Sequence, residues 1–318
     1  MIQQDTQILD VWCWPSTPQH DMWTQGYGSA TAHHGEILQG VFEGIDGGLH
    51  RGLVTLPCSI FRSEATFVPD PNGPLIIDPP GKCKARQAVE LTLRHYGKTM
   101  WGGRLILRSN IPQCWGLGSS TCDVTAAIRA VADAFTTKLA PTTIAELAVK
   151  VEAASDSIMF EDRSVLFAHR DGIVIEELGG PLPPLEVVGF NTDPTGEGID
   201  TLSFSPARYS WWEVEAFRPM IGLLRRAIST QDPRLVGQVA LASARMNQRH
   251  LPKPQFDRLE RLVEMTQAVS LQVAHSGTVA GILFDPSDSD KCEKIQQAQA
   301  VIAELGFGAA WHFQTGNI

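Results

Sequence analysis

The residues with the clearest chemical potential form a glycine- and serine-rich segment near the middle of the chain. The segment is Pro112-Gln113-Cys114-Trp115-Gly116-Leu117-Gly118-Ser119-Ser120-Thr121. Glycines let a backbone approach a ligand closely, and a helix that begins near Ser119 would point unpaired N–H groups and the positive end of its dipole outward. These properties are typical of a phosphate-binding loop, in which Ser119 and Ser120 offer hydroxyls to a phosphate or to Mg²⁺. An ordinary turn with a capping serine has the same composition, and the segment matches neither the Walker A nor the dinucleotide pattern.

A second polar segment, nearer the N-terminus, can recognise a small charged molecule. It is Ala32-His33-His34-Gly35-Glu36-Ile37-Leu38-Gln39-Gly40. The Glu36 carboxylate can bind an ammonium group, and the Gln39 amide can bind a carboxylate or a hydroxyl. His33 and His34 are adjacent and would point to opposite faces of a strand, so they make a poor joint metal site. Taken alone, the segment fits a surface hairpin with solvated side chains better.

Two carboxylates and a third glycine-containing segment complete the candidates. Glu152 and Asp156 lie four residues apart near the end of an expected helix. They share one face if the helix continues, and they are separated if it ends between them. The third segment is Ala274-His275-Ser276-Gly277-Thr278-Val279-Ala280-Gly281-Ile282-Leu283, which taken alone is a turn before a buried strand.

The composition suits a folded enzyme. The chain has 318 residues, of which 43% are hydrophobic and 19% charged, so two domains that share a cleft are expected rather than disorder. The net charge of −9 argues against a general nucleic-acid binder. The cysteines form no C-x-x-C pair, which argues against structural zinc, and without a secretory signal we expect reduced thiols. No apolar run reaches the roughly 18 residues of a membrane helix.

Hydrophobic periodicity predicts mixed strands and helices that do not alternate strictly. In the first half we expect strands 26–42 and 52–68, a helix 84–96, a strand 104–108, helices from 119 and over 142–153, and a strand 172–177. In the second half we expect a strand 185–190, three helices that end near residues 228, 246 and 269, a strand 279–284, a helix 288–305 and a strand 309–314. The Gly- and Pro-rich segment 179–184 is the expected domain boundary. This pattern predicts an α+β protein of two modules.

Together, the candidate segments resemble the motifs of the GHMP kinases, the family of galactokinase, homoserine kinase and mevalonate kinase. The run P-x-x-x-G-L-G-S-S before an amphipathic helix resembles the family's phosphate-binding motif. The form G-E-hydrophobic-hydrophobic-Q-G around Glu36 looks most like the L-threonine kinases of cobalamin biosynthesis, and so does His275-Ser276. The motifs occur in the family's order and span nearly the whole chain from about Gly26.

The resemblance implies roles for the matching residues. The ATP phosphates would contact Pro112, Gly116, Leu117, Gly118, Ser119, Ser120 and Thr121. Ser120 and Glu152 would hold Mg²⁺, and Asp156 would orient or deprotonate the acceptor hydroxyl, which makes these three the catalytic set. The acceptor would contact Glu36, Gln39, His34, Asp156, His275, Ser276, Gly277 and Thr278. The N-terminal motif lacks the lysine that some members use to assist the aspartate, and the lysine closest in sequence to the carboxylates is Lys150.

The resemblance also implies the two-domain GHMP kinase fold, with a ribosomal-protein-S5-like N-terminal domain and a ferredoxin-like C-terminal domain. The expected divisions are an N-terminal extension over residues 1–25, an ATP-binding domain over 26–182 and a C-terminal domain over 183–318. ATP and the acceptor would meet in the cleft between the two domains.

The expected function is that of a cytoplasmic, ATP-dependent kinase that phosphorylates the side-chain hydroxyl of a small amino acid, with L-threonine as the first choice. Homoserine, serine or an amino alcohol of specialised metabolism would need no change in the motifs. A GHMP-fold binding protein without catalysis is the alternative from another class, which the intact Ser120, Glu152 and Asp156 disfavour. The expected partners are ATP, Mg²⁺ and the acceptor, with no nucleic acid, no membrane, and a monomer or homodimer as the assembly.

Overall fold

The computed structural model describes residues 23–194, 196, 207–308 and 310–316. The first half contains β1 (Gly26–Glu43), β2 (Leu49–Asp70), β3 (Leu75–Asp78), α1 (Cys83–His95), β4 (Gly102–Ser109), α2 (Ser119–Ala134), α3 (Pro141–Glu152), β5 (Val165–Ala168) and β6 (Ile173–Glu177). The second half contains β7 (Glu186–Asn191), α4 (Trp211–Thr230), α5 (Pro233–Asn247), α6 (Phe256–Thr266), β8 (Ser270–Val273), β9 (Val279–Phe284), α7 (Lys291–Glu304) and β10 (Trp311–Gln314).

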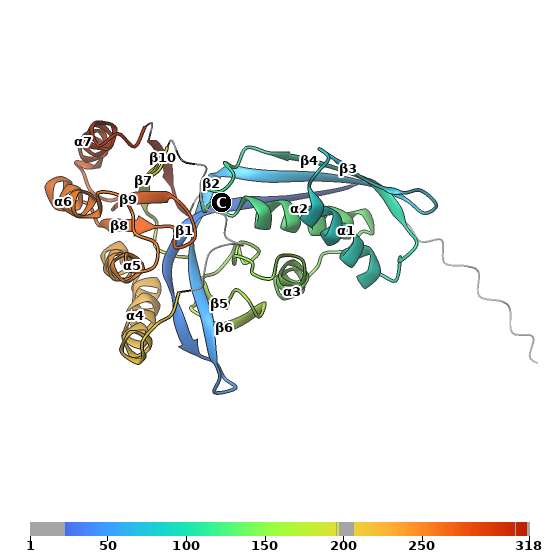
Figure 1. Ribbon diagram of the computed structural model, residues 1–318, viewed down its shortest axis with the longest axis horizontal. Helices are drawn as coiled ribbons and strands as arrows, with labels where there is room; N and C mark the ends of the chain where they lie inside the picture. The colour runs from blue at the N-terminus through green and yellow to red at the C-terminus, as the bar shows by residue number, and fades with distance from the viewer. Residues whose placement is uncertain (1–22, 195, 197–206, 309, 317–318) are drawn as a thin grey trace, which may run out of the picture.

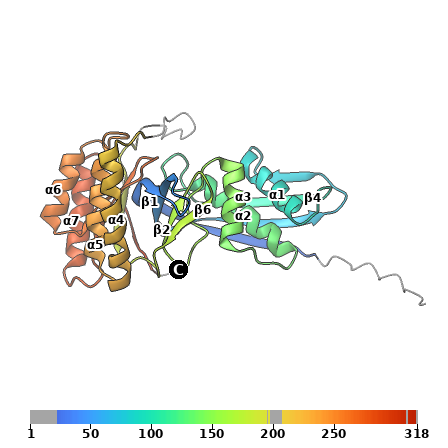
Figure 2. The ribbon, with the colours of Figure 1, turned by 90° about the horizontal axis from the view of Figure 1, so that it is seen from below.

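The described strands form one continuous sheet with helices grouped at its two ends. The strand order is β10-β7-β9-β8-β1-β2-β4-β3, and β5 and β6 branch from β2. Helices α1, α2 and α3 cover the β1–β4 part, while α4 to α7 form a separate layer on the β7–β10 part (Figures 1 and 2). Within the second half, the order β10-β7-β9-β8 and the chain order β-α-β-β-α-β give a ferredoxin-like unit with extra helices between β7 and β8.

Strand β1 joins the two halves because it pairs with both β2 and β8. Its pairing with β2 shifts register between His33 and Glu36. In a regular strand, residues three apart point to opposite faces, but an irregularity of this kind re-aims the side chains beyond it. One ligand atom each from His33 and Glu36 therefore lies within 4.8 Å of the other and of an Asp156 oxygen. The sheet thus gathers charged groups at the junction of the two halves.

Helix α2 is the central helix of the first half and is buried on nearly every side. Five of its twelve buried positions are alanine, and Val124, Ile128 and Val131 are the larger apolar members. Small side chains let a helix lie close to a sheet, so the start of α2 is held firmly over β1. The Gly- and Ser-rich segment that precedes α2 is positioned by this packing.

Most expected elements are confirmed within a few residues, and two details differ. Short strands β3, β5 and β8 were missed, because four residues give little periodicity. The helix expected to reach residue 269 ends at Thr266, since Gln267 adopts a left-handed conformation and Val269 N–H bonds to Leu283 O. Most of the expected extension, residues 1–22, lies outside the described residues. The expected boundary segment 179–184 falls between β6 and β7, although the sheet continues through β1.

No helix among the described residues combines the length and the apolar character needed to cross a membrane. The five described cysteines are free thiols, and Cys58 and Cys122 are buried.

Candidate active site

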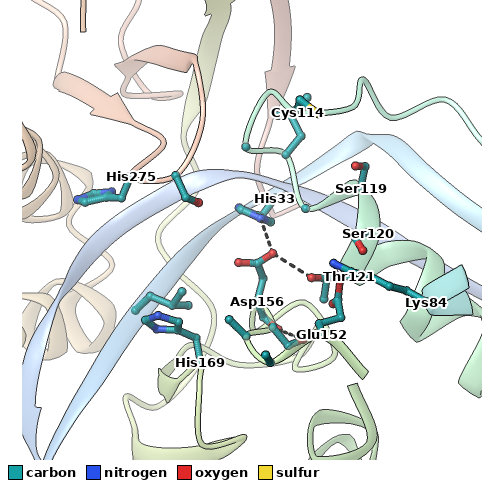
Figure 3. A pocket seen from close by; sticks show the side chains of 18 of the residues that line it. His33, Lys84, Cys114, Ser119, Ser120, Thr121, Glu152, Asp156, His169 and His275 are labelled. Carbon is teal, nitrogen blue, oxygen red and sulfur yellow. Dashed lines mark hydrogen bonds and ion pairs between the residues drawn. The ribbon is translucent and has the colours of Figure 1, made fainter. Parts of the chain in front are cut away.

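A cleft of about 980 Å³ lies where β1, the start of α2, the end of α3 and the loop after β8 meet. Figure 3 shows its side chains converging from these separate elements. Most of the residues expected to bind ATP or acceptor line this cleft. They are Glu36, Gln39, Gly116, Leu117, Gly118, Ser119, Ser120, Thr121, Glu152, Asp156, His275 and Ser276.

The start of α2 has the open geometry of an anion site. Gly118, not a serine, occupies the N-cap, and no side chain caps the helix or places an acid in its first turn. The Ser119 and Ser120 hydroxyls are therefore not used as helix caps, and the first N–H groups have no side-chain acceptor. Gly118 has φ 73°, and a Cβ there would lie 2.5 Å from His33 Cδ2, so only glycine fits this close approach.

Glu152 ends α3 beside the start of α2, and its side chain is buried. Its Oε1 accepts a hydrogen bond from Lys84 Nζ at 3.2 Å, while its Oε2 is buried without a hydrogen-bond partner. Burial raises the pKa of Glu152, and the Ser120 hydroxyl and the Lys84 charge offset only part of that rise. A buried carboxylate oxygen without a partner, next to a hydroxyl, is a donor set that fits Mg²⁺.

Asp156 lies on the loop after α3 and faces both β1 and α2. Its Oδ2 lies 3.0 Å from His33 Nε2 and accepts a hydrogen bond from Thr121 Oγ1 at 3.2 Å. Its Oδ1 has no hydrogen-bond partner among the described residues. His33 Nδ1 lies 3.1 Å from Gly35 O, which fixes the ring. One carboxylate oxygen of Asp156 is thus held in place and the other is open to the cleft.

Asp156 and His33 each stabilise the charged form of the other. Burial lowers the pKa of His33, but the Asp156 carboxylate more than offsets it and raises that pKa to about 9. Burial raises the pKa of Asp156, but the His33 charge and hydrogen bond bring it below the ordinary value. His169 lies on another side of Asp156 (Figure 3), and burial lowers its pKa to about 4, so it is neutral at pH 7. At neutral pH the site holds an ionised aspartate beside one histidinium.

A second group couples the N-terminal motif to the loop after β8. Glu36 Oε2 accepts from His275 N–H at 2.8 Å and lies 3.1 Å from His275 Nδ1. On its other side, His275 Nε2 lies 2.8 Å from Ser243 Oγ, which accepts the Gln39 N–H at 3.2 Å. Glu36 Oε2 is therefore bonded to His275, whereas Glu36 Oε1 has no hydrogen-bond partner among the described residues.

Four of the residues expected to contact a ligand do not line the cleft. His34 is fully buried away from the cleft, where its ring packs on Trp311 and Phe313 and burial lowers its pKa to about 4. Strand alternation explains this, since His33 and not its neighbour faces the cleft. Pro112, Gly277 and Thr278 do not line the cleft either. Gly277 instead packs directly against the backbone of the phosphate loop at Trp115 and Gly116.

The sequence assigned no role to several cleft residues, most of which come from segments outside the candidate motifs. Among them are His33, Lys82, Lys84, Arg51, Asp123, His169, Arg170 and Tyr209. Lys84, not the exposed Lys150, is the lysine that reaches Glu152, and Lys82 Nζ donates to Asp123 Oδ2 at 2.7 Å. Two lysines at the start of α1, Lys82 at its N-cap and Lys84 in its first turn, were a visible signal, but only the fold shows which carboxylates they contact.

Comparisons with known proteins agree with this geometry. Residues 84–160 match the family model described as the GHMP kinases N terminal domain. An L-threonine kinase of Salmonella typhimurium is 31% identical over 281 residues, which are 87% of this chain and 87% of that protein. The chain is a GHMP kinase. As a member of that family, it is an ATP-dependent phosphotransferase that acts on a hydroxyl group.

The chain is also similar to a second L-threonine kinase and to solved structures of other kinases. An L-threonine kinase of Citrobacter freundii is 30% identical over 199 residues, 59% of this chain and 64% of that protein. A homoserine kinase from Cytophaga hutchinsonii has a TM-score of 0.65 at 16% identity, covering 95% of this chain and 96% of that one. Mevalonate kinase from L. major has a TM-score of 0.58 at 15% identity, covering 93% and 97%. At such identities the structural likeness shows the fold alone.

Proposed function

We propose that this GHMP kinase transfers the γ-phosphoryl group of ATP to the side-chain hydroxyl of L-threonine, giving O-phospho-L-threonine and ADP. The observation that carries the proposal is the state of Asp156, whose Oδ2 is held by His33 and Thr121 while Oδ1 is open to the cleft. The threonine acceptor rests on the relative named L-threonine kinase at 31% identity.

The phosphates of ATP would bind at the start of α2, where the first N–H groups and the hydroxyls of Ser119 and Ser120 are available. Ser120 and Glu152 would hold Mg²⁺, which neutralises charge on the β- and γ-phosphates when bound. Lys84 adds a positive charge beside Glu152. The net charge of the chain is negative, so these local groups supply the attraction for a polyanion.

Asp156 Oδ1 would accept the hydrogen bond of the acceptor hydroxyl and orient it toward the γ-phosphorus. A carboxylate with a lowered pKa is a weak base, but a loose phosphoryl-transfer transition state leaves most of the work to positioning. The proton of the hydroxyl would pass to Asp156 as the new O–P bond forms. His33, held by Gly35 O, fixes the carboxylate in this orientation.

Charged groups farther along the cleft suit the two ends of an amino acid. Arg51 lines the cleft, and its only hydrogen bond to a described residue is to the Ala207 carbonyl at 2.7 Å. No carboxylate of a described residue pairs with it. A guanidinium with free donors is suited to a carboxylate. Glu36 Oε1 has no partner of its own and is suited to an ammonium group.

The acceptor is tested by ADP formation with Mg-ATP and a panel of L-threonine, D-threonine, L-serine, L-homoserine and 1-amino-2-propanol, with products identified by mass spectrometry. We expect L-threonine to gain one phosphoryl group and to be preferred. The amino alcohol, which lacks a carboxylate for Arg51, is expected to be poor. Phosphorylation of L-homoserine in its place would retain the kinase and reject threonine as the acceptor.

The replacement Arg51→Gln tests carboxylate recognition directly. We expect KM for L-threonine to rise about 10- to 100-fold, because hydrogen bonds to a charged group contribute about 1.5–3 kcal/mol. The KM for the amino alcohol should not change, since it has no carboxylate to lose. The exposed Arg226 on α4 gives the matched control Arg226→Gln. An equal rise for both acceptors would assign Arg51 a structural role.

The pH dependence of turnover tests the charge on His33. Because its pKa is raised to about 9, the imidazolium is present at neutral pH and is lost as pH rises through 9. At saturating ATP, kcat/KM for L-threonine should therefore fall above about pH 9. His33→Lys should move this fall to higher pH, and His33→Gln should remove it while lowering activity about tenfold. His95→Gln, at an exposed site on α1, is the control, and an unchanged alkaline fall in His33→Gln would exclude this role.

A further inference from the structure

Lys253 is a buried ammonium without an acidic partner. It lies in the segment after α5 and is 5% exposed, and no other lysine of the described residues is in the buried class. Its Nζ donates to Gly277 O at 2.6 Å, and none of the ion pairs among described residues includes it. Burial lowers the pKa of Lys253 to about 8, and the Glu36 charge offsets only part of that effect.

A buried charge with only one carbonyl acceptor is costly to the folded protein. Desolvation of an ammonium costs several kcal/mol unless an opposite charge or several hydrogen bonds offset it. The Glu36 charge offsets only part of this cost, because no ion pair within 4.0 Å joins it to Lys253. A group of this kind is expected where a bound anion supplies the missing charge.

The carbonyl that Lys253 holds belongs to a loop packed against the phosphate loop. A Cβ added to Gly277 would lie 2.2 Å from Trp115 O and 2.3 Å from Gly116 Cα, so the two backbones are in direct contact. The contact continues in the hydrogen bonds from Thr278 N and Val279 N to Trp115 O, at 2.9 and 3.1 Å. The two loops thus form one backbone unit, and Lys253 lies against it without lining the cleft.

We propose that Lys253 is a positioning residue for the nucleotide, a buried ammonium that fastens the Gly277 loop to the phosphate loop and supplies positive charge behind the bound phosphates. The occupant is a nucleoside polyphosphate, so the inference rests on the proposed function and deepens it. Lys253 acts through the peptide that joins Gly277 to Thr278: a cation on the Gly277 carbonyl polarises the Thr278 N–H, which donates to Trp115 O in the phosphate loop. The chain has a net charge of −9, which repels a polyanion. A buried positive charge is screened little by water and therefore attracts the phosphates more strongly than an exposed one would.

The test compares Lys253→Met, which removes both charge and donor, with Lys253→Gln, which removes the charge and keeps a donor. ADP affinity is measured by calorimetry, and the Tm of the ligand-free protein is measured alongside. We expect Kd for ADP to rise about tenfold or more in both variants, because both lose the charge. We also expect the ligand-free Tm to hold or to rise by about 2–4 °C, because a desolvated charge has been removed. The exposed Lys150→Met is the matched control.

Each other outcome has a definite meaning. If Lys253→Gln binds ADP as the wild type does, the hydrogen bond alone matters and the charge proposal is overturned. Unchanged affinity in both variants, or a loss of affinity that accompanies a lower Tm, overturns it as well, since the second pattern is that of a structural residue. A wild-type protein that does not bind ADP or ATP would instead reject the proposed function itself.

Discussion

Asp156→Asn is expected to lower kcat by about 10²–10⁴-fold with little change in KM for ATP, if Asp156 orients and deprotonates the acceptor. The amide keeps the shape of the side chain and can still meet Thr121, but it carries no charge for His33 and is a far weaker base. Because Asp156 lies beside and not among the groups expected to hold the phosphates, nucleotide binding should persist. The measurement is steady-state kinetics with both substrates varied, together with ADP binding.

The matched control is Asp162→Asn, whose carboxylate lies in the following turn with 75% of its side chain exposed. It should behave as the wild type. A second comparison uses Asp156→Glu, which keeps the charge but moves it, and should recover only part of the loss. If Asp156→Asn retains more than about a tenth of the wild-type kcat, positioning and electrostatics at the phosphate loop suffice for catalysis, and Asp156 only binds the acceptor.

The two halves of the site differed in how far sequence could predict them. The phosphate loop is local, since a Gly-rich turn, two serines and an apolar helix occur within one short run, and its structure followed the expectation. The capping serine of the alternative interpretation is absent, because Gly118, with φ 73°, occupies the N-cap and lies close to His33. That contact is between residues far apart in the chain, so no local pattern contains it.

The acceptor side depends on register and on a helix end, which local patterns define poorly. Strand alternation places His33 and His34 on opposite faces, but it does not say which of them faces the cleft. The register shift between His33 and Glu36 then alters the face to which Glu36 points. In the same way, the end of α3 at Glu152 sends the two carboxylates to different partners. Glu152 meets Lys84 and Asp156 meets His33.

The second large effect is expected for Glu152→Gln, which should reduce kcat at least about 100-fold and raise the Mg²⁺ concentration needed for half-maximal rate. The substitution is nearly isosteric, but a neutral amide is a weaker ligand for a hard cation than a carboxylate. Glu146→Gln, exposed on the same helix, is the matched control. Full turnover in Glu152→Gln with an unchanged Mg²⁺ requirement would remove Glu152 from the catalytic set.

Stability provides an independent readout for the same variant. Burial raises the pKa of Glu152 in the folded protein, so folding favours its protonated form. The stabilising contribution of this group is therefore present at low pH and is lost as pH rises through the folded pKa, and at pH 7 the ionised carboxylate destabilises the fold. Replacing it with glutamine should leave Tm at pH 7 unchanged or higher, and the difference from the wild type should disappear as the pH is lowered. Loss of activity together with an undiminished Tm would mark a carboxylate kept for its chemistry, since a residue that serves packing alone would change both properties in the same direction.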